Sequence, residues 1–137
     1  MKRFAFAAGL LASVASLCLQ AQAADLQASI PFEFRMGTSV MPAGDYKIYQ
    51  THSGLVTLRK LDGQPKSVGL LTIPASRKTI TGEGSLQFNR YGDTYVLTSV
   101  WNPSSHEGRA LHQSVVEKEL IGRSGQVQTA GIPLRRN

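Results

Sequence analysis

Cysteine is almost absent from this sequence. Its 137 residues include a single one, Cys18, which lies in an apolar run near the N-terminus that we expect to be removed. The remaining chain would then hold no thiol, which excludes a disulfide framework, a cysteine nucleophile and a cysteine-based metal site. No glycine-rich loop precedes a predicted helix, so the sequence gives no support for nucleotide binding either.

Only one long apolar run is present, and it begins the chain. Lys2 and Arg3 precede apolar residues 4–19, and the small-x-small motif of residues 21–23 follows. This order is typical of a secretory signal peptide, and the apolar stretch is short for a membrane span. We therefore predict a signal peptide over residues 1–23 and export to the periplasm or to the outside of the cell.

Acidic residues are also few, since nine Asp and Glu oppose 15 Lys and Arg. Removal of residues 1–23 would leave 114 residues with 13 basic and nine acidic side chains, a net charge of +4. This length suits one domain, which we predict over residues 24–121. Because an exported protein is not expected to meet nucleic acid, an unknown protein or an anionic envelope polymer is the expected partner. The oligomeric state stays open.

The rest of the chain has the pattern of an all-β protein. From Gly37 to Gly92, turn residues recur at about 8–12-residue intervals between alternating runs, a spacing typical of antiparallel sandwiches and barrels. We predict a small barrel or sandwich of six to eight strands with a short C-terminal helix. Strands of this length fall short of those in an outer-membrane barrel, so the protein is not expected to span a membrane after cleavage.

The clearest hairpin covers residues 85–101, where Gly92-Asp93 suits a two-residue turn. That turn predicts the pairs Tyr91–Thr94, Arg90–Tyr95, Asn89–Val96, Phe88–Leu97 and Leu86–Ser99. The core face would then carry Leu86, Phe88, Tyr95, Leu97 and Trp101. Val96 and Val100 would lie on the opposite face.

A second hairpin surrounds Asp62-Gly63. A two-residue loop would place Arg59 opposite Lys66, and directly opposed like charges are unfavourable. A three-residue loop over residues 62–64 instead pairs Leu58 with Val68 and Val56 with Leu70, and we prefer it.

Another reversal is expected at Pro42-Ala43-Gly44, between a strand with Ile30, Phe32 and Phe34 on one face and a strand over residues 46–51. Pro31 cannot donate to a ladder, so the first of these strands should lie at an edge or begin there.

The C-terminal part is less regular. Ser114 and Glu117 form a capping-box pattern that predicts a helix over residues 114–121, although Val115 and Ile121 would also fit a final strand. Residues 122–137 are polar and aperiodic, and we expect a flexible tail there.

Three separated blocks, IPFEFRMGTSVMPAGDYKI, SRKTITGEGSLQFNRYGDTYVLTSVW and GRALHQSVVEKEL, resemble a family of short exported proteins frequent in acidobacterial genomes. The resemblance covers most of the chain after the signal peptide and implies a small secreted β-rich domain. It implies no activity and brings no catalytic residue.

Catalytic and metal-binding patterns were weighed residue by residue. Ser104, Ser105 and His106 adjoin one another in a loop, a placement that does not favour a triad, and Asp93 lies at a hairpin tip. The spacing of His106, Glu107 and His112 fits neither a helical nor a strand metal site. We therefore predict no enzyme and assign no catalytic, cofactor-binding or metal-binding residue.

Binding remains as the expected role, with Tyr49 and Tyr91 as the surface candidates among the aromatic residues. The first hypothesis is a non-enzymatic envelope or secreted interaction module that uses its faces or an edge strand. The alternatives are a small barrel that carries an apolar ligand and, last, a hydrolase.

Overall fold

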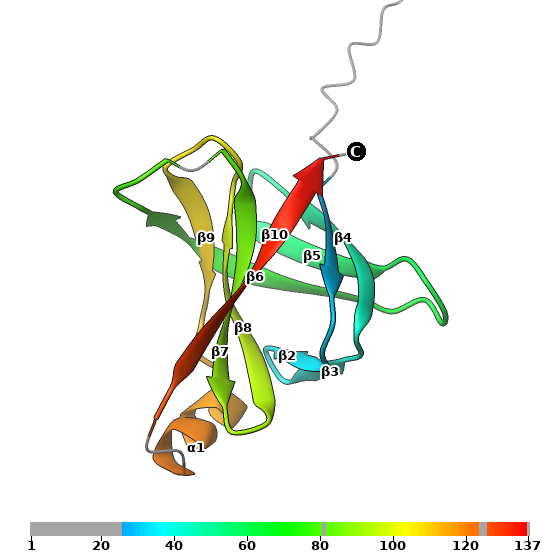
Figure 1. Ribbon diagram of the computed structural model, residues 1–137, viewed down its shortest axis with the longest axis vertical. Helices are drawn as coiled ribbons and strands as arrows, with labels where there is room; N and C mark the ends of the chain where they lie inside the picture. Colours follow the sequence, from blue (N-terminus) through cyan, green and yellow to red (C-terminus); the bar gives the residue numbers. More distant parts are fainter. Residues whose placement is uncertain (1–25, 81, 124–125, 137) are drawn as a thin grey trace, which may run out of the picture.

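The computed structural model describes residues 26–80, 82–123 and 126–136, so the predicted signal peptide lies outside the described residues. The chain forms ten strands and one helix in these ranges (Figure 1). The strands are β1 Leu26–Ile30, β2 Phe34–Met36, β3 Ser39–Met41, β4 Gly44–Gln50, β5 Leu55–Lys60, β6 Ser67–Ser76, β7 Gly84–Tyr91, β8 Thr94–Trp101, β9 Glu107–Leu111 and β10 Gln128–Arg136. The helix is α1 Val115–Arg123.

Eight of the strands close into an antiparallel barrel, which confirms the predicted fold class and decides for the barrel. Their order is β8-β7-β10-β1-β4-β5-β6-β9, and β9 pairs back onto β8 through Ser99–Ala110, Val100–Arg109 and Trp101–Gly108. The short hairpin β2–β3 lies outside this ring. Its strand β2 pairs in parallel with the first residues of β8. The same edge of β8 pairs with β9 nearer to its C-terminal end.

The prediction of a flexible tail over residues 122–137 is wrong, because this region contains a central barrel strand. β10 pairs with β7 over seven residues and with β1 over two, and Figure 1 shows it crossing the whole barrel. Gly131 and Pro133 weaken the local strand signal. Ala130, Ile132 and Leu134 nevertheless face Phe88, Leu86 and Gly84 of β7, so long-range pairing on both edges orders the segment.

The β7–β8 hairpin follows the predicted register up to Phe88–Leu97 and then departs from it. A bulge shifts the ladder there, so that Gln87 pairs with Ser99 and Leu86 with Val100. The hydroxyl of the extra residue, Thr98, donates to the Gln87 carbonyl at 3.0 Å and satisfies it in the disturbed ladder.

Beyond the bulge, the two faces of β8 exchange. Val100, predicted outside, is fully buried in the core, whereas Trp101, predicted inside, is half-buried on the outer side. The Trp101 ring covers Gly108 of β9, where a Cβ atom would lie only 2.4 Å from the ring.

Two other local predictions are confirmed, whereas the predicted strand through Ile30, Phe32 and Phe34 is interrupted at residues 31–33. β5 and β6 pair Leu58 with Val68 and Val56 with Leu70, and residues 115–123 are helical with Ser114 as N-cap. The expectation that Pro31 marks an edge strand is wrong, because β1 lies between β10 and β4. This strand ends at Ile30, so Pro31 follows it and no ladder hydrogen bond requires an N–H there.

The interior of the barrel is filled with side chains. The largest of those that are less than 2 % exposed are Tyr46, Phe34, Phe88, Ile30, Met36, Met41, Leu58, Leu86, Leu97, Val56 and Val100. Helix α1 lies at one end, beside the tip of the β7–β8 hairpin (Figure 1). We call this the helix end, and we call the opposite end, where β4, β6 and β8 finish, the mouth end. In the described part of the chain, no helix is both long and apolar enough to cross a membrane.

Candidate functional site: a basic face on the barrel

The outer side of β10, β1, β4 and β5 carries a row of basic side chains. The ladders align Arg135 with Gln27, Gln27 with Lys47, and Lys47 with Arg59. All four point outward, because their chain neighbours Leu134, Leu26, Ile48 and Leu58 are buried in the core. Since neighbouring strands lie about 4.8 Å apart, three cations share one narrow row across the sheet.

The row concentrates positive charge at its centre, where Lys47 and Arg59 form a directly opposed pair. Directly opposed like charges destabilise a sheet by roughly 0.2–1 kcal/mol. Arg59 is exposed, and among the described residues no ion pair neutralises it. The Arg59 guanidinium is therefore available to an anion at the centre of the row.

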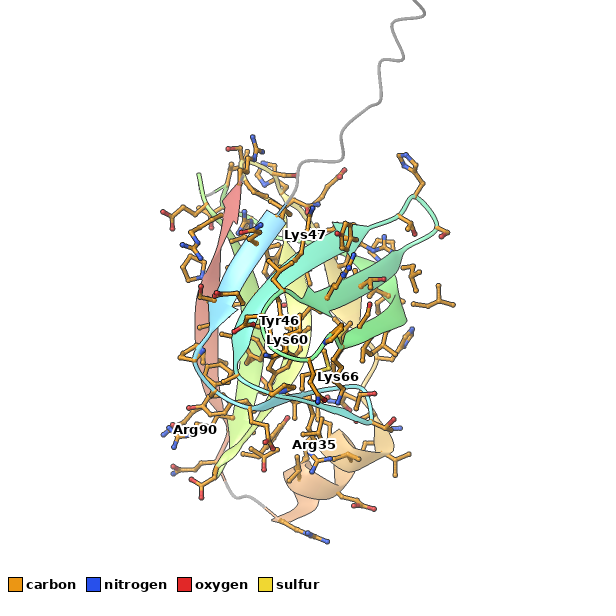
Figure 2. The ribbon with its side chains drawn as sticks, turned by 90° about the vertical axis from the view of Figure 1, so that its right-hand side faces the viewer. Arg35, Tyr46, Lys47, Lys60, Lys66 and Arg90 are labelled. Carbon is orange, nitrogen blue, oxygen red and sulfur yellow. The ribbon has the colours of Figure 1, made fainter. Side chains whose placement is uncertain are left out.

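Tyr49 extends the row toward the mouth end. It lies on the same outer face as Lys47, whose Nζ is 5.4 Å from the centre of the Tyr49 ring, and it pairs with Thr57 across the ladder. Tyr49 is half-buried, so part of its side chain remains accessible to solvent. We call the surface formed by Gln27, Lys47, Tyr49, Thr57, Arg59 and Arg135 the basic face; Figure 2 views this side of the barrel, with Lys47 labelled on it.

One edge of the basic face is held by a polar network. The Arg135 guanidinium donates to the Ser29 hydroxyl at 2.8 Å, and that hydroxyl donates to the Asp45 carboxylate at 2.6 Å. The backbone N–H of Asp45 donates in turn to Asp62, which forms an ion pair with Lys60 at 3.3 Å. These contacts orient Arg135 and supply the acidic border of the face.

Two side chains at this border, Asp62 and Tyr46, have shifted pKa values. The backbone hydrogen bond from Asp45 is the main cause that lowers the pKa of Asp62, and Lys60 lowers it further. Burial, aided by the nearby Asp62 charge, raises the pKa of Tyr46 to about 12. The Tyr46 hydroxyl donates to the Pro42 carbonyl beneath the face, so Tyr46 is a structural residue. Figure 2 shows Tyr46 and Lys60 side by side.

The structure separates the two tyrosines predicted as surface candidates. Tyr49 lies on the basic face, but Tyr91 is only 3 % exposed, so its assignment as a surface binding residue is wrong. The Tyr91 hydroxyl donates to the Glu117 carboxylate of α1 at 2.9 Å, and Asn89 donates to the same hydroxyl at 3.3 Å. The helix therefore covers this tyrosine, which no signal within the β7–β8 strands could have revealed.

The residues weighed for catalysis do not converge. His106 Nδ1 lies 2.9 Å from the Arg77 carbonyl oxygen, and the Ser105 hydroxyl accepts from the Glu107 N–H at 3.0 Å. Asp93 is at the helix end, with Arg90 at 4.0 Å, whereas Ser104 to His106 lie at the mouth end. Within residues 26–80, 82–123 and 126–136, no three His, Cys, Asp or Glu side chains form a group that could hold a metal ion.

Sequence reasoning found Tyr49 but missed the row beside it. Arg135 lay in the predicted tail, and Lys47 and Arg59 looked like scattered charges, because the row depends on the three ladders β10–β1, β1–β4 and β4–β5. The β4–β5 register was the one signal that could have paired Lys47 with Arg59.

No protein-family model, no curated protein and no solved structure matches this chain. The resemblance to an acidobacterial family of exported proteins therefore stays a prediction, and the function has to be argued from the site itself.

Proposed function

We propose that this protein is an exported, non-enzymatic interaction module that binds an anionic envelope polymer through the basic face. The observation that carries the proposal is the cross-strand row of Arg135, Lys47 and Arg59 with Tyr49 beside it. An extended row of cations suits a repeated anion along a chain, and an amphipathic ring beside the cations suits the apolar side of a sugar.

The filled interior supports a surface role over a carrier role. A carrier needs empty volume inside the barrel, but Phe34, Tyr46 and Phe88 occupy it together with the aliphatic core residues. The alignment of Lys47 with Arg59 supports the same choice, because it places two cations side by side on the outer surface of the sheet.

The test is binding to immobilised polygalacturonate, a polysaccharide of repeated carboxylates, with uncharged dextran as the comparison. We expect binding that weakens as salt is added, because exposed charges are screened. Arg59→Gln should lower the affinity severalfold while leaving stability unchanged or raising it by roughly 0.2–1 kcal/mol. The matched control is Lys118→Gln on α1, which removes the same charge far from the face.

The two variants separate a site from a net-charge effect. If Lys118→Gln weakened binding as much as Arg59→Gln, the polymer would be responding to total charge and the basic face would not be its site. Absence of binding to polygalacturonate at low salt would refute the polymer proposal. Tight, stoichiometric binding of an apolar fluorescent dye would instead favour the carrier.

A further inference from the structure

The mouth end of the barrel holds a second feature, which is independent of the basic face. A cleft of about 540 Å³ opens there between the end of β4, the end of β6 and the start of β9. Its polar lining includes Gln50, His52, Ser76, Asn102, Glu107 and Arg109. This volume lies within the range of small-molecule sites in proteins, roughly 300–1,000 Å³.

Arg109 reaches the cleft from the interior side of β9. It pairs across the ladder with Val100, which is fully buried, so the Arg109 side chain leaves the strand toward the barrel axis. Its Nε donates to the Thr72 hydroxyl and its Nη2 to the Thr72 carbonyl, both at 2.8 Å. These bonds use two of the five guanidinium N–H groups and fix the orientation of the plane.

The surrounding backbone is shaped around this guanidinium. Gly54 has a φ of +88°, and a Cβ atom at Gly54 would lie 2.1 Å from Arg109 Nη2, so only glycine leaves room for the group. Thr72, itself 8 % exposed, donates its hydroxyl to the Gly54 carbonyl at 2.6 Å. The guanidinium is therefore held by buried partners and does not move freely on the surface.

Glu107 supplies the opposite charge in the same cleft. It lies two residues before Arg109 on β9, and residues at that spacing project from the same side of a strand. Within the described residues, neither the Arg109 guanidinium nor the Glu107 carboxylate forms an ion pair, with each other or with another side chain. A cation and an anion thus line one cleft without neutralising each other.

We propose that this cleft binds a small zwitterion, either a free α-amino acid or a short peptide. Its carboxylate is received by the guanidinium of Arg109 and its ammonium group by the carboxylate of Glu107. A guanidinium with fixed orientation matches the planar geometry of a carboxylate. The nearby amide groups of Gln50 and Asn102, joined by a 2.7 Å hydrogen bond, offer further polar contacts for a peptide group.

The test follows backbone amide shifts of the protein by NMR during titration with free amino acids and with dialanine. Glycine and alanine form one arm and dialanine the other, so the arms distinguish an amino acid from a peptide. N-acetyl-dialanine and dialanine amide remove the ammonium and the carboxylate charge separately. For the ligand that binds, each blocked form should lose about tenfold or more in affinity, as expected for a charge-assisted hydrogen bond.

Two variants assign the two charges. Glu107→Gln should weaken binding of the free ligand and abolish the difference in affinity between the free and N-acetylated forms, because the partner of the ammonium is gone. Arg109→Gln should do the same for the difference in affinity between free and amidated forms, because the cation that receives the carboxylate is gone. Glu119→Gln and Arg123→Gln on α1 are the matched controls and should leave binding unchanged.

The outcomes are separable from those of the basic face. Zwitterion binding should survive Arg59→Gln, and polymer binding should survive Glu107→Gln, so either proposal can fail alone. The zwitterion proposal is overturned if neither glycine, alanine nor dialanine shifts the signals of residues lining the cleft. It is also overturned if binding persists undiminished in Glu107→Gln, a substitution at an exposed position that folding tolerates.

Discussion

The two ends of the barrel differ in the chemistry of their side chains. At the helix end, Phe32 stacks on Tyr95 with ring centres 3.7 Å apart and meets Phe88 edge-on, while Phe34 contacts both Phe88 and Tyr46. At the mouth end, the contacts are polar hydrogen bonds: Arg109 donates to Thr72, and Gln50 donates to Asn102. One end is closed by aromatic packing, and the other is lined by polar groups around a cleft.

The difference shows where the fold keeps its stability and where it has room for function. At the helix end, the buried carboxylate of Glu117 is satisfied, because it accepts a hydrogen bond from Tyr91. At the mouth end, Arg109 and Glu107 stay without an ion-pair partner among the described residues. Charges that line a cleft without an ion-pair partner are available to a ligand of opposite charge.

The largest effect should come from breaking the aromatic packing. Phe88→Ala empties a fully buried position between Phe32 and Phe34, and we expect a loss of about 3–5 kcal/mol in the free energy of unfolding. Urea denaturation followed by circular dichroism measures it. Leu71→Ala, at a side chain that is 66 % exposed, is the control and should cost less than about 0.5 kcal/mol. Equal costs would show that the helix end does not hold the stability assigned to it.

An intermediate effect should appear at alkaline pH. Because burial raises the pKa of Tyr46 from 10.0 to about 12, the folded state favours the neutral phenol. This contribution to stability is fully present below pH 10 and is lost as the pH rises through about 12. Other tyrosines and the lysines titrate in the same range, so the measured quantity is the difference between the protein and Tyr46→Phe. That difference in unfolding free energy should shrink between pH 10 and pH 12, and a constant difference would contradict the assignment.

The smallest effect is expected at the mouth end. Gln50→Ala removes the 2.7 Å hydrogen bond to Asn102, and because water reaches both groups, the loss should be about 0.5–1.5 kcal/mol. Urea unfolding measures the loss in free energy of unfolding for Gln50→Ala, and the same experiment on Phe88→Ala provides the comparison. A loss as large as that of Phe88→Ala would erase the contrast between the two ends.

Elements that depend on near neighbours along the chain could be predicted before the structure was known. The turn at Gly92-Asp93, the β5–β6 register that pairs Leu58 with Val68 and the cap at Ser114 each followed from local chemistry, and the structure confirms all three. The all-β class followed in the same way, because alternation and turn residues report on the backbone within a few positions.

Features that depend on distant partners could not be predicted, because they form only when the chain has folded. The strand β10 exists because β7 and β1 flank it, the faces of Val100 and Trp101 exchange because Thr98 bulges, and Tyr91 is buried because α1 covers it. Both candidate sites belong to this group. The row of Arg135, Lys47 and Arg59 spans more than eighty positions of the chain, and it is aligned only because β1 pairs with both β10 and β4.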